Sequence, residues 1–224
     1  MPKLFYMQSS SGLSRHARFK ILSENISALI EEEGLLVRPY GHATLPYFNL
    51  LTAEEQEQVL RDILIYFQVC TDVKSQNGSL KDTRLFTEKA IHRLGVSVDP
   101  FILEQIQPHH LIEIYTQAQT QIFRSLKFFE VCSYSLEDLY CRKWYHLYQR
   151  TTQDQENLEA DIGRYYSQSP LRTIQATAPE HTIHALGALE RDEIITQIFW
   201  LSPLQSLTKG DSYILTVATS RLPQ

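Results

Sequence analysis

Residues 193–220, EIITQIFWLSPLQSLTKGDSYILTVATS, decide the fold class of this 224-residue chain. Two runs in the stretch, 193–204 and 213–220, are rich in β-branched and aromatic residues, and the segment 209–211, Lys-Gly-Asp, is typical of a tight turn between strands. The stretch therefore predicts an antiparallel hairpin. Both alternating faces of the first run are apolar at its centre, so we expect other elements to cover this strand on both sides.

The rest of the carboxyl-terminal half fits the same sheet. A third strand is expected within residues 171–189, joined to the hairpin by a polar turn at residues 190–192 and interrupted or placed at an edge by Pro179. The run FFEVCSY at residues 128–134 predicts another short strand. Ser135 and Thr152 start two helix-capping patterns, so we expect helices after each of them.

Helical periodicity fills the amino-terminal half. Apolar residues recur at three- and four-residue spacing after Ser14, and the first helix is expected to end at Gly34. Thr52 begins a second helix with a capping box, and Gly95 is expected to close a third. Asp99 before a proline begins a further helix of one or two turns.

A helical seam is expected after Pro108, where apolar residues fall on an alternating four-and-three spacing that suits pairing with another helix. The seam consists of Leu111, Tyr115, Ala118, Ile122 and Phe129. Packing within the chain and pairing with a second copy both explain it. The switch from helical to strand periodicity predicts an α+β protein with a flexible leader at 1–13, a helical domain at 14–127 and an α+β domain at 128–224.

Composition excludes several classes of function. The chain has 21 Lys and Arg residues against 26 Asp and Glu, a net charge of −5 and no basic run, which disfavours nucleic-acid binding. Its longest apolar stretches are far shorter than the roughly 18 to 20 residues that cross a bilayer. Cys70, Cys132 and Cys141 are odd in number and widely spaced, which fits neither a disulfide framework nor a metal site and favours the cytoplasm.

No catalytic or metal-binding motif stands out in the sequence. His109 and Glu113 would share one face of a helix, but a metal site needs a third ligand, and solvated first-turn residues are the simpler interpretation. Cys132 is the only residue near a nucleophile-like turn, and no triad accompanies it. We therefore expect no metal and name no catalytic residue and no cofactor.

Polar and aromatic residues of the carboxyl-terminal half suggest a ligand site. In a strand, His181 and His184 would point to opposite faces, so they could not share an ion, although one of them could line a pocket. A second group interleaves cations with aromatic residues, and we interpret its aromatic members as core or pocket lining and its cations as a solvated rim. This group consists of Arg142, Lys143, Trp144, Tyr145, Tyr148 and Arg150.

These observations predict a pocket between the sheet and the helices that follow Ser135. We expect its lining to include Trp144, Tyr148, Phe199 and Leu201, with His184 as a polar member. The alternative is that side chains fill this space and that it is only core.

Residues 128–139, FFEVCSYSLEDL, resemble the PAS-domain segment with the pattern xFxxxxGYSxEEL, which leads from the second strand into the first short helix, with Ser133 in place of the glycine. Residues 198–220 resemble the last two PAS strands. One departure is that no first strand is expected before Phe128. The stretches 86–96 and 109–126 are similar to the helical dimerisation domains of RsbU-type phosphatases and of KaiA.

The resemblance implies a non-enzymatic sensory or regulatory module for signalling, which binds a small apolar ligand or a protein partner and pairs through its amino-terminal helices. The alternative is a small α+β enzyme or ligand carrier whose sheet forms a pocket for an anionic molecule. His181, His184, Arg172 or Arg191 would then bind the anion. The two hypotheses differ in whether these polar groups converge inside one cavity.

Overall fold

The computed structural model describes residues 12–116, 120–186, 193–206 and 213–223. Helices dominate its amino-terminal half and an antiparallel, curled sheet dominates its carboxyl-terminal half, so the protein is α+β, as predicted. None of the described helices is long and apolar enough to cross a bilayer.

Short polar signals set the ends of the helices. Thr52 caps α3 with a complete capping box, in which the Thr52 hydroxyl and the Glu55 carboxylate each accept the other residue's backbone N–H, and Gly95 ends α4 with a φ of 65°. The structure thus confirms the predicted start of a helix at Thr52 and the predicted end of a helix at Gly95. The α-helices are α1 (Arg15–Glu31), α2 (Pro46–Leu50), α3 (Ala53–Ser75), α4 (Thr83–Leu94), α5 (Pro100–Gln105), α6 (Lys127–Val131), α7 (Leu136–Cys141) and α8 (Thr152–Tyr166), with a 3-10 helix, η3, at Trp144–His146.

The sheet has the strand order β3-β2-β8-β7-β6-β4, and its neighbouring strands are antiparallel. β7 and β8 form the predicted hairpin, paired from Ile195 opposite Arg221 to Leu204 opposite Tyr213 with a register shift between Ile198 and Trp200, and β6 is the predicted third strand. The expected turns at 190–192 and 209–211 lie outside the described residues. The strands are β1 (Val96–Ser97), β2 (Leu111–Thr116), β3 (Gln121–Arg124), β4 (Tyr148–Gln149), β5 (Ile174–Gln175), β6 (His181–Ala185), β7 (Glu193–Ser206) and β8 (Tyr213–Arg221).

The predicted helical seam after Pro108 is wrong, because residues 111–116 and 121–124 are the strands β2 and β3. β2 pairs along its whole length with β8, from Leu111 opposite Ala218 to Thr116 opposite Tyr213. This long-range ladder outweighs the helical spacing of the seam, whose member Ala118 lies outside the described residues. The sheet thus takes strands from both sides of residue 127.

Local structure also differs after β3. The sequence predicts a strand at residues 128–134, whereas the helix α6 begins there, because the backbone N–H groups of Phe128 and Phe129 donate to the carbonyls of Ser125 and Leu126. The helix expected after Ser135 has the predicted cap but ends at Cys141, and η3 follows it.

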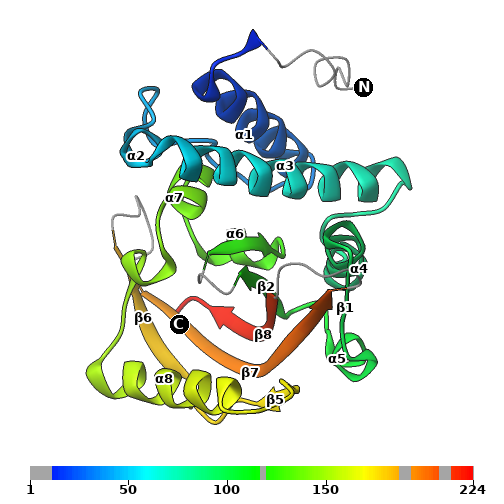
Figure 1. Cartoon of the computed structure of the whole chain (residues 1–224), viewed down its shortest axis with the longest axis vertical. Helices are drawn as coiled ribbons and strands as arrows, with labels where there is room; N and C mark the ends of the chain where they lie inside the picture. Colours follow the sequence, from blue (N-terminus) through cyan, green and yellow to red (C-terminus); the bar gives the residue numbers. More distant parts are fainter. Residues whose placement is uncertain (1–11, 117–119, 187–192, 207–212, 224) are drawn as a thin grey trace.

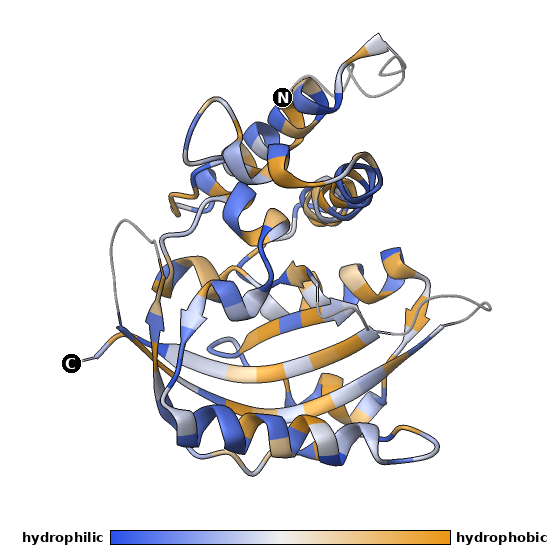
Figure 2. Ribbon diagram, turned by 60° about the vertical axis from the view of Figure 1, so that its left-hand side comes forward, coloured by the Kyte–Doolittle hydropathy of each residue, from blue (hydrophilic) through white to orange (hydrophobic). Residues whose placement is uncertain are grey.

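The two faces of the sheet are covered by different helices. On one face, Ile114 lies opposite Phe123, whose ring packs against Tyr66 of α3 and Phe86 of α4. In Figure 1, α1 and α3 lie at one end of the molecule and α8 at the other, with the sheet between them. Figure 2 shows apolar residues along the curved strands and a mixture of polar and apolar residues along α8. The second face is the one that α8 and η3 help to enclose.

Candidate ligand-binding site

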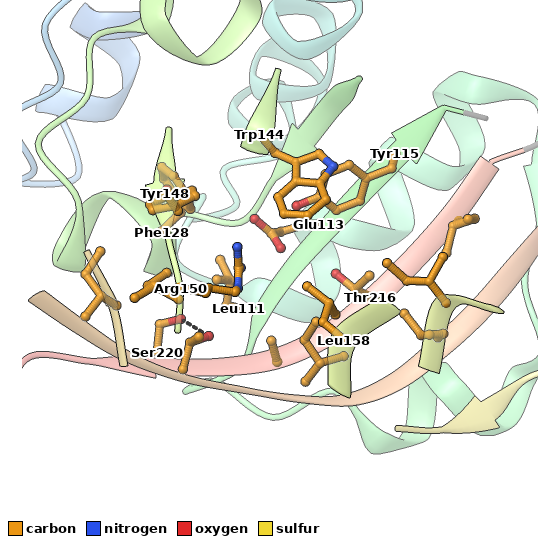
Figure 3. A pocket seen from close by; sticks show the side chains of 18 of the residues that line it. Leu111, Glu113, Tyr115, Phe128, Trp144, Tyr148, Arg150, Leu158, Thr216 and Ser220 are labelled. Atoms are coloured by element: carbon orange, nitrogen blue, oxygen red, sulfur yellow. Dashed lines mark hydrogen bonds between the residues drawn. The ribbon is translucent and has the colours of Figure 1, made fainter. Parts of the chain in front are cut away.

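A cavity of about 130 Å³ lies between the second face of the sheet and the segments α6, η3, β4 and α8. Figure 3 shows its labelled side chains gathered on the concave side of the curved strands. An apolar cavity of ~150 Å³ holds a benzene molecule, so this space accommodates about one small ring. Its lining is mostly apolar and includes Leu111, Phe128, Val131, Leu158, Ile162, Ile183, Ile194, Ile198, Leu201, Ile214 and Ala218.

Strand alternation explains which residues line the cavity. On β2 the alternating residues Leu111, Glu113 and Tyr115 line the cavity, together with Thr116 at the end of the strand, and on β8 the lining residues are every second residue from Ile214 to Ser220. On β7 the alternation is broken by a bulge between Ile198 and Trp200. The same face therefore continues beyond the bulge with an odd-numbered residue.

The bulge determines which of two predicted lining residues borders the cavity. Leu201 lines the cavity, but Phe199 is the extra residue of the bulge, lies outside the lining and packs against the ring of His110 at 5.8 Å. Strict alternation places Phe199 and Leu201 on one face, so sequence alone could not separate them. Trp144 and Tyr148 line the cavity where they were expected.

The two histidines of β6 point to opposite faces, as their spacing predicts. His184 is nearly half exposed, lies 3.8 Å from the carboxylate of Glu193 and does not line the cavity, which corrects its place in the predicted site. His181 is buried and lines the cavity. Its Nδ1 lies 3.0 Å from the carbonyl oxygen of Pro179, which can only accept, so Nδ1 carries the proton.

Arg150 is a lining residue that the sequence interpretation missed. Instead of lying in a solvated rim, its guanidinium stacks over the Trp144 ring at 5.2 Å, and its Nε donates to Nε2 of His181 at 3.3 Å. Burial lowers the pKa of Arg150. A separation of two residues from Tyr148 at the short strand β4 is the signal that could have placed both side chains on one face.

Glu113 brings a carboxyl group to the same cavity. Its carboxylate accepts hydrogen bonds from the Gln121 amide and from the Tyr115 hydroxyl, and the amide also lies 3.3 Å from that hydroxyl. Glu113 is partly accessible because it borders the cavity, although protein groups surround its carboxyl group. Burial is the largest effect on its pKa, which is raised.

The predicted alternatives for metal and nucleophile chemistry are not supported by the placement of their residues. Glu113 lies in a strand and borders the cavity, whereas His109 is exposed before that strand, so they do not form a helical pair. Within the described residues no group of three potential metal ligands comes together. Burial raises the pKa of the Cys132 thiol to about 11, which leaves it protonated and a poor nucleophile at neutral pH.

Hydroxyl groups complete the polar part of the lining. Thr196 on β7 and Ser220 on β8 hydrogen-bond to each other at 3.0 Å, and the Thr196 hydroxyl lies 3.1 Å from the carbonyl oxygen of Thr219. Thr216 lines the cavity beside them, and its buried hydroxyl has no hydrogen-bond partner among the described residues. The cavity thus combines apolar walls with a few polar groups, which is typical of a small-molecule site.

No protein-family model matches the chain, and no curated protein has a significantly similar sequence.

Proposed function

We propose that the chain is a non-enzymatic sensory or regulatory module that binds a small, largely apolar molecule in this cavity. The carrying observation is the cavity itself, with about 130 Å³ of space, apolar walls and the polar cluster of Glu113, Arg150 and His181. A site of this kind buries most of a small ligand and orients it through few polar contacts.

The order of elements supports the resemblance to PAS domains. The sequence interpretation lacked a first strand before Phe128, and β2 and β3 now precede it. The segment after β3 leads into short helices, and β7 and β8 occupy the place of the closing strands. A PAS-like assignment remains our proposal, carried by this order and by the position of the cavity.

The alternative of an enzyme or anion carrier receives support from only part of its proposed residues. His181 lines the cavity, whereas His184 and Arg172 are exposed and Arg191 lies outside the described residues. Arg150 supplies the cationic group that this alternative requires. The position of Arg150 in the cavity favours a module that binds an anion. Glu113, the carboxyl group beside it, is held by two hydrogen bonds within the protein, which favours this form of the module over a catalytic one.

We further propose that the module works in the cytoplasm and passes its signal through a protein partner or a homodimer formed by the amino-terminal helices. Two large apolar side chains beside these helices support an interaction there, since Leu36 is 86% exposed and Leu50 is 82% exposed. Light scattering of the wild-type chain and of a Leu36→Ser, Leu50→Ser double variant tests this proposal. Loss of association in the variant is expected, and a wild-type monomer would contradict the dimer.

A pocket-filling variant tests ligand binding. We expect toluene and benzoate to shift the amide NMR signals of cavity residues in the wild-type protein. Leu158→Trp fills the cavity from α8 and should abolish these shifts, while Leu50→Trp makes the same exchange at an exposed site and should preserve them. Ala218→Leu fills the cavity from β8 and guards against misfolding of the first variant. Shifts that persist in both filled variants would refute the site.

A further inference from the structure

We infer that the natural ligand carries a carboxylate group and that Arg150 binds it, with an apolar body of about one ring against the walls of the cavity. The inference rests on the proposed function and names the chemical class of its ligand. It is carried by the position of Arg150 in the cavity and by the partners that surround its guanidinium.

The guanidinium of Arg150 is held in place with donors to spare. Trp144 covers one face of its plane, and His181 accepts the hydrogen bond from Nε. In Figure 3 the guanidinium points into the cavity. Since arginine has five N–H donors in a rigid fork, its terminal nitrogens can present a pair of parallel donors to a planar carboxylate.

Arg150 forms no close ion pair with the described residues, although Glu113 and Asp154 act on it over a longer distance. In the described ranges, no carboxylate lies within 4.0 Å of its nitrogen atoms, whereas Arg142 is 3.2 Å from Asp138 and Arg164 is 2.8 Å from Asp161. A partly buried cation without a close ion pair is costly to maintain. A ligand anion at this position would form that ion pair.

Glu113 does not satisfy Arg150. Its carboxyl group already accepts hydrogen bonds from Gln121 and Tyr115, on the neighbouring strands of the sheet. Burial raises its pKa, and neither of its two hydrogen bonds goes to Arg150, so Glu113 acts on the guanidinium only over a longer distance. An ammonium ligand is disfavoured as well, because Arg150 would repel it and the Glu113 carboxyl group already accepts two hydrogen bonds from the protein.

The walls limit the rest of the ligand. Leu158 and Ile162 of α8 face Ile183, Ile194 and Ile198 of the sheet across the cavity, and these side chains offer no hydrogen bond. A phosphate has charged oxygens on several sides, whereas Arg150 is the one Arg or Lys side chain among the described lining residues and most of the lining is apolar, so a monocarboxylate fits better. Benzoate and hexanoate have the required combination of one acidic end and one apolar body.

Isothermal titration with matched acids and amides tests the inference on the full chain. We expect benzoate to bind at least tenfold more tightly than benzamide, and hexanoate at least tenfold more tightly than hexanamide, which corresponds to about 1.4 kcal/mol. Arg150→Gln should bring both ratios close to one. Arg150→Lys should leave an intermediate ratio, because it keeps the charge but loses the fork. Arg172→Gln removes the same charge at an exposed site and should leave the ratios unchanged.

The outcomes separate this inference from the proposed function. Equal binding of acids and amides would overturn the carboxylate and leave the ligand module standing. An acid preference that survives in Arg150→Gln would overturn the assignment to Arg150. If neither acids, amides nor toluene bind at about 1 mM or below, both proposals fail. The wild-type ratios decide the ligand class even if an Arg150 variant does not fold.

Discussion

The two faces of the sheet are built from alternate residues of the same strands and differ in how they are filled. Ile112, Ile114, Leu215 and Val217 on the first face are completely buried. Glu113 and the other residues between them turn to the second face, where they border a cavity. Neighbouring residues of one strand thus face either a closely packed core or the cavity, because side chains alternate along a strand.

The cover of each face explains this difference. The first face meets α3 and α4 through close ring contacts, such as the 4.9 Å between Phe86 and Phe123. The second face meets α8, which carries Asp161 and Arg164 in polar contact with the segment before β6. Apolar packing closes the first face, whereas hydrogen bonds help to position the cover of the second face at a distance that leaves space.

The largest expected effect comes from truncating matched isoleucines on the two faces. Ile114 of β2 and Ile194 of β7 are both buried, but only Ile194 borders the cavity. Ile114→Ala should lower the free energy of unfolding by about 4 kcal/mol, and Ile194→Ala by about 2 kcal/mol, within the usual range for such truncations. Urea unfolding measures both values. An equal loss at the two positions would mean that the second face is as closely packed as the first.

The second prediction concerns the hydrogen bonds that hold α8. The buried Asp161 carboxylate accepts the backbone N–H groups of Thr177 and Ala178 and the hydroxyl of Thr177. Asp161→Ala should cost about 3 kcal/mol, because it leaves buried donors unpaired. Asp154→Ala, on the same helix but at its exposed cap, should cost about 1 kcal/mol. Similar losses for the two variants would show that the Asp161 contacts do not fasten the cover of the cavity.

Sequence patterns predicted the parts of the fold whose signals are local. The hairpin of β7 and β8 combines two apolar runs with turn residues, and the caps at Thr52 and Gly95 act within one helical turn. β2 and β3 were missed because their apolar residues coincide with a helical spacing. The partner that makes β2 a strand is β8, about a hundred residues away in the chain.

The candidate site was predictable to a similar degree. Trp144, Tyr148 and Leu201 were identified from apolar character and alternation, and they line the cavity. Phe199 was wrongly included, since a β-bulge is a tertiary feature that single-sequence alternation does not reveal. Arg150 was taken for a solvated cation, because an arginine is usually exposed unless a fold supplies an aromatic face and a buried acceptor.

The third prediction uses the pH dependence of stability to examine the second face. The folded protein raises the pKa of Glu113 above its ordinary value of 4.5, chiefly by burial. Between these two values the folded state holds a proton that the unfolded state releases, so Glu113 makes stability fall as pH rises. Glu113→Gln removes this contribution.

Urea midpoints at several pH values check the Glu113 prediction. The stability of Glu113→Gln relative to the wild type should increase as pH rises above about 4.5 and level off above the folded pKa. Other groups with shifted pKa values, such as Glu33 and Glu137, occur in both proteins and cancel in the difference. A difference that stays constant, or that falls as pH rises, would show that Glu113 is a stable anion in the fold.

The smallest effects are expected from two threonines on the second face, and they should have opposite signs. Thr216 has a buried hydroxyl without a partner among the described residues, whereas the Thr196 hydroxyl interacts with Ser220 and with the carbonyl of Thr219. Thr216→Val replaces a desolvated hydroxyl with a methyl group of the same shape and should stabilise the protein by about 1 kcal/mol, whereas Thr196→Val should destabilise it by about 1 kcal/mol. Calorimetry of both variants gives the signs directly. Because the two side chains lie on neighbouring strands and border one cavity, a loss of stability in Thr216→Val would mean that its hydroxyl is solvated in the cavity, and the second face would then be wetter than its apolar walls indicate.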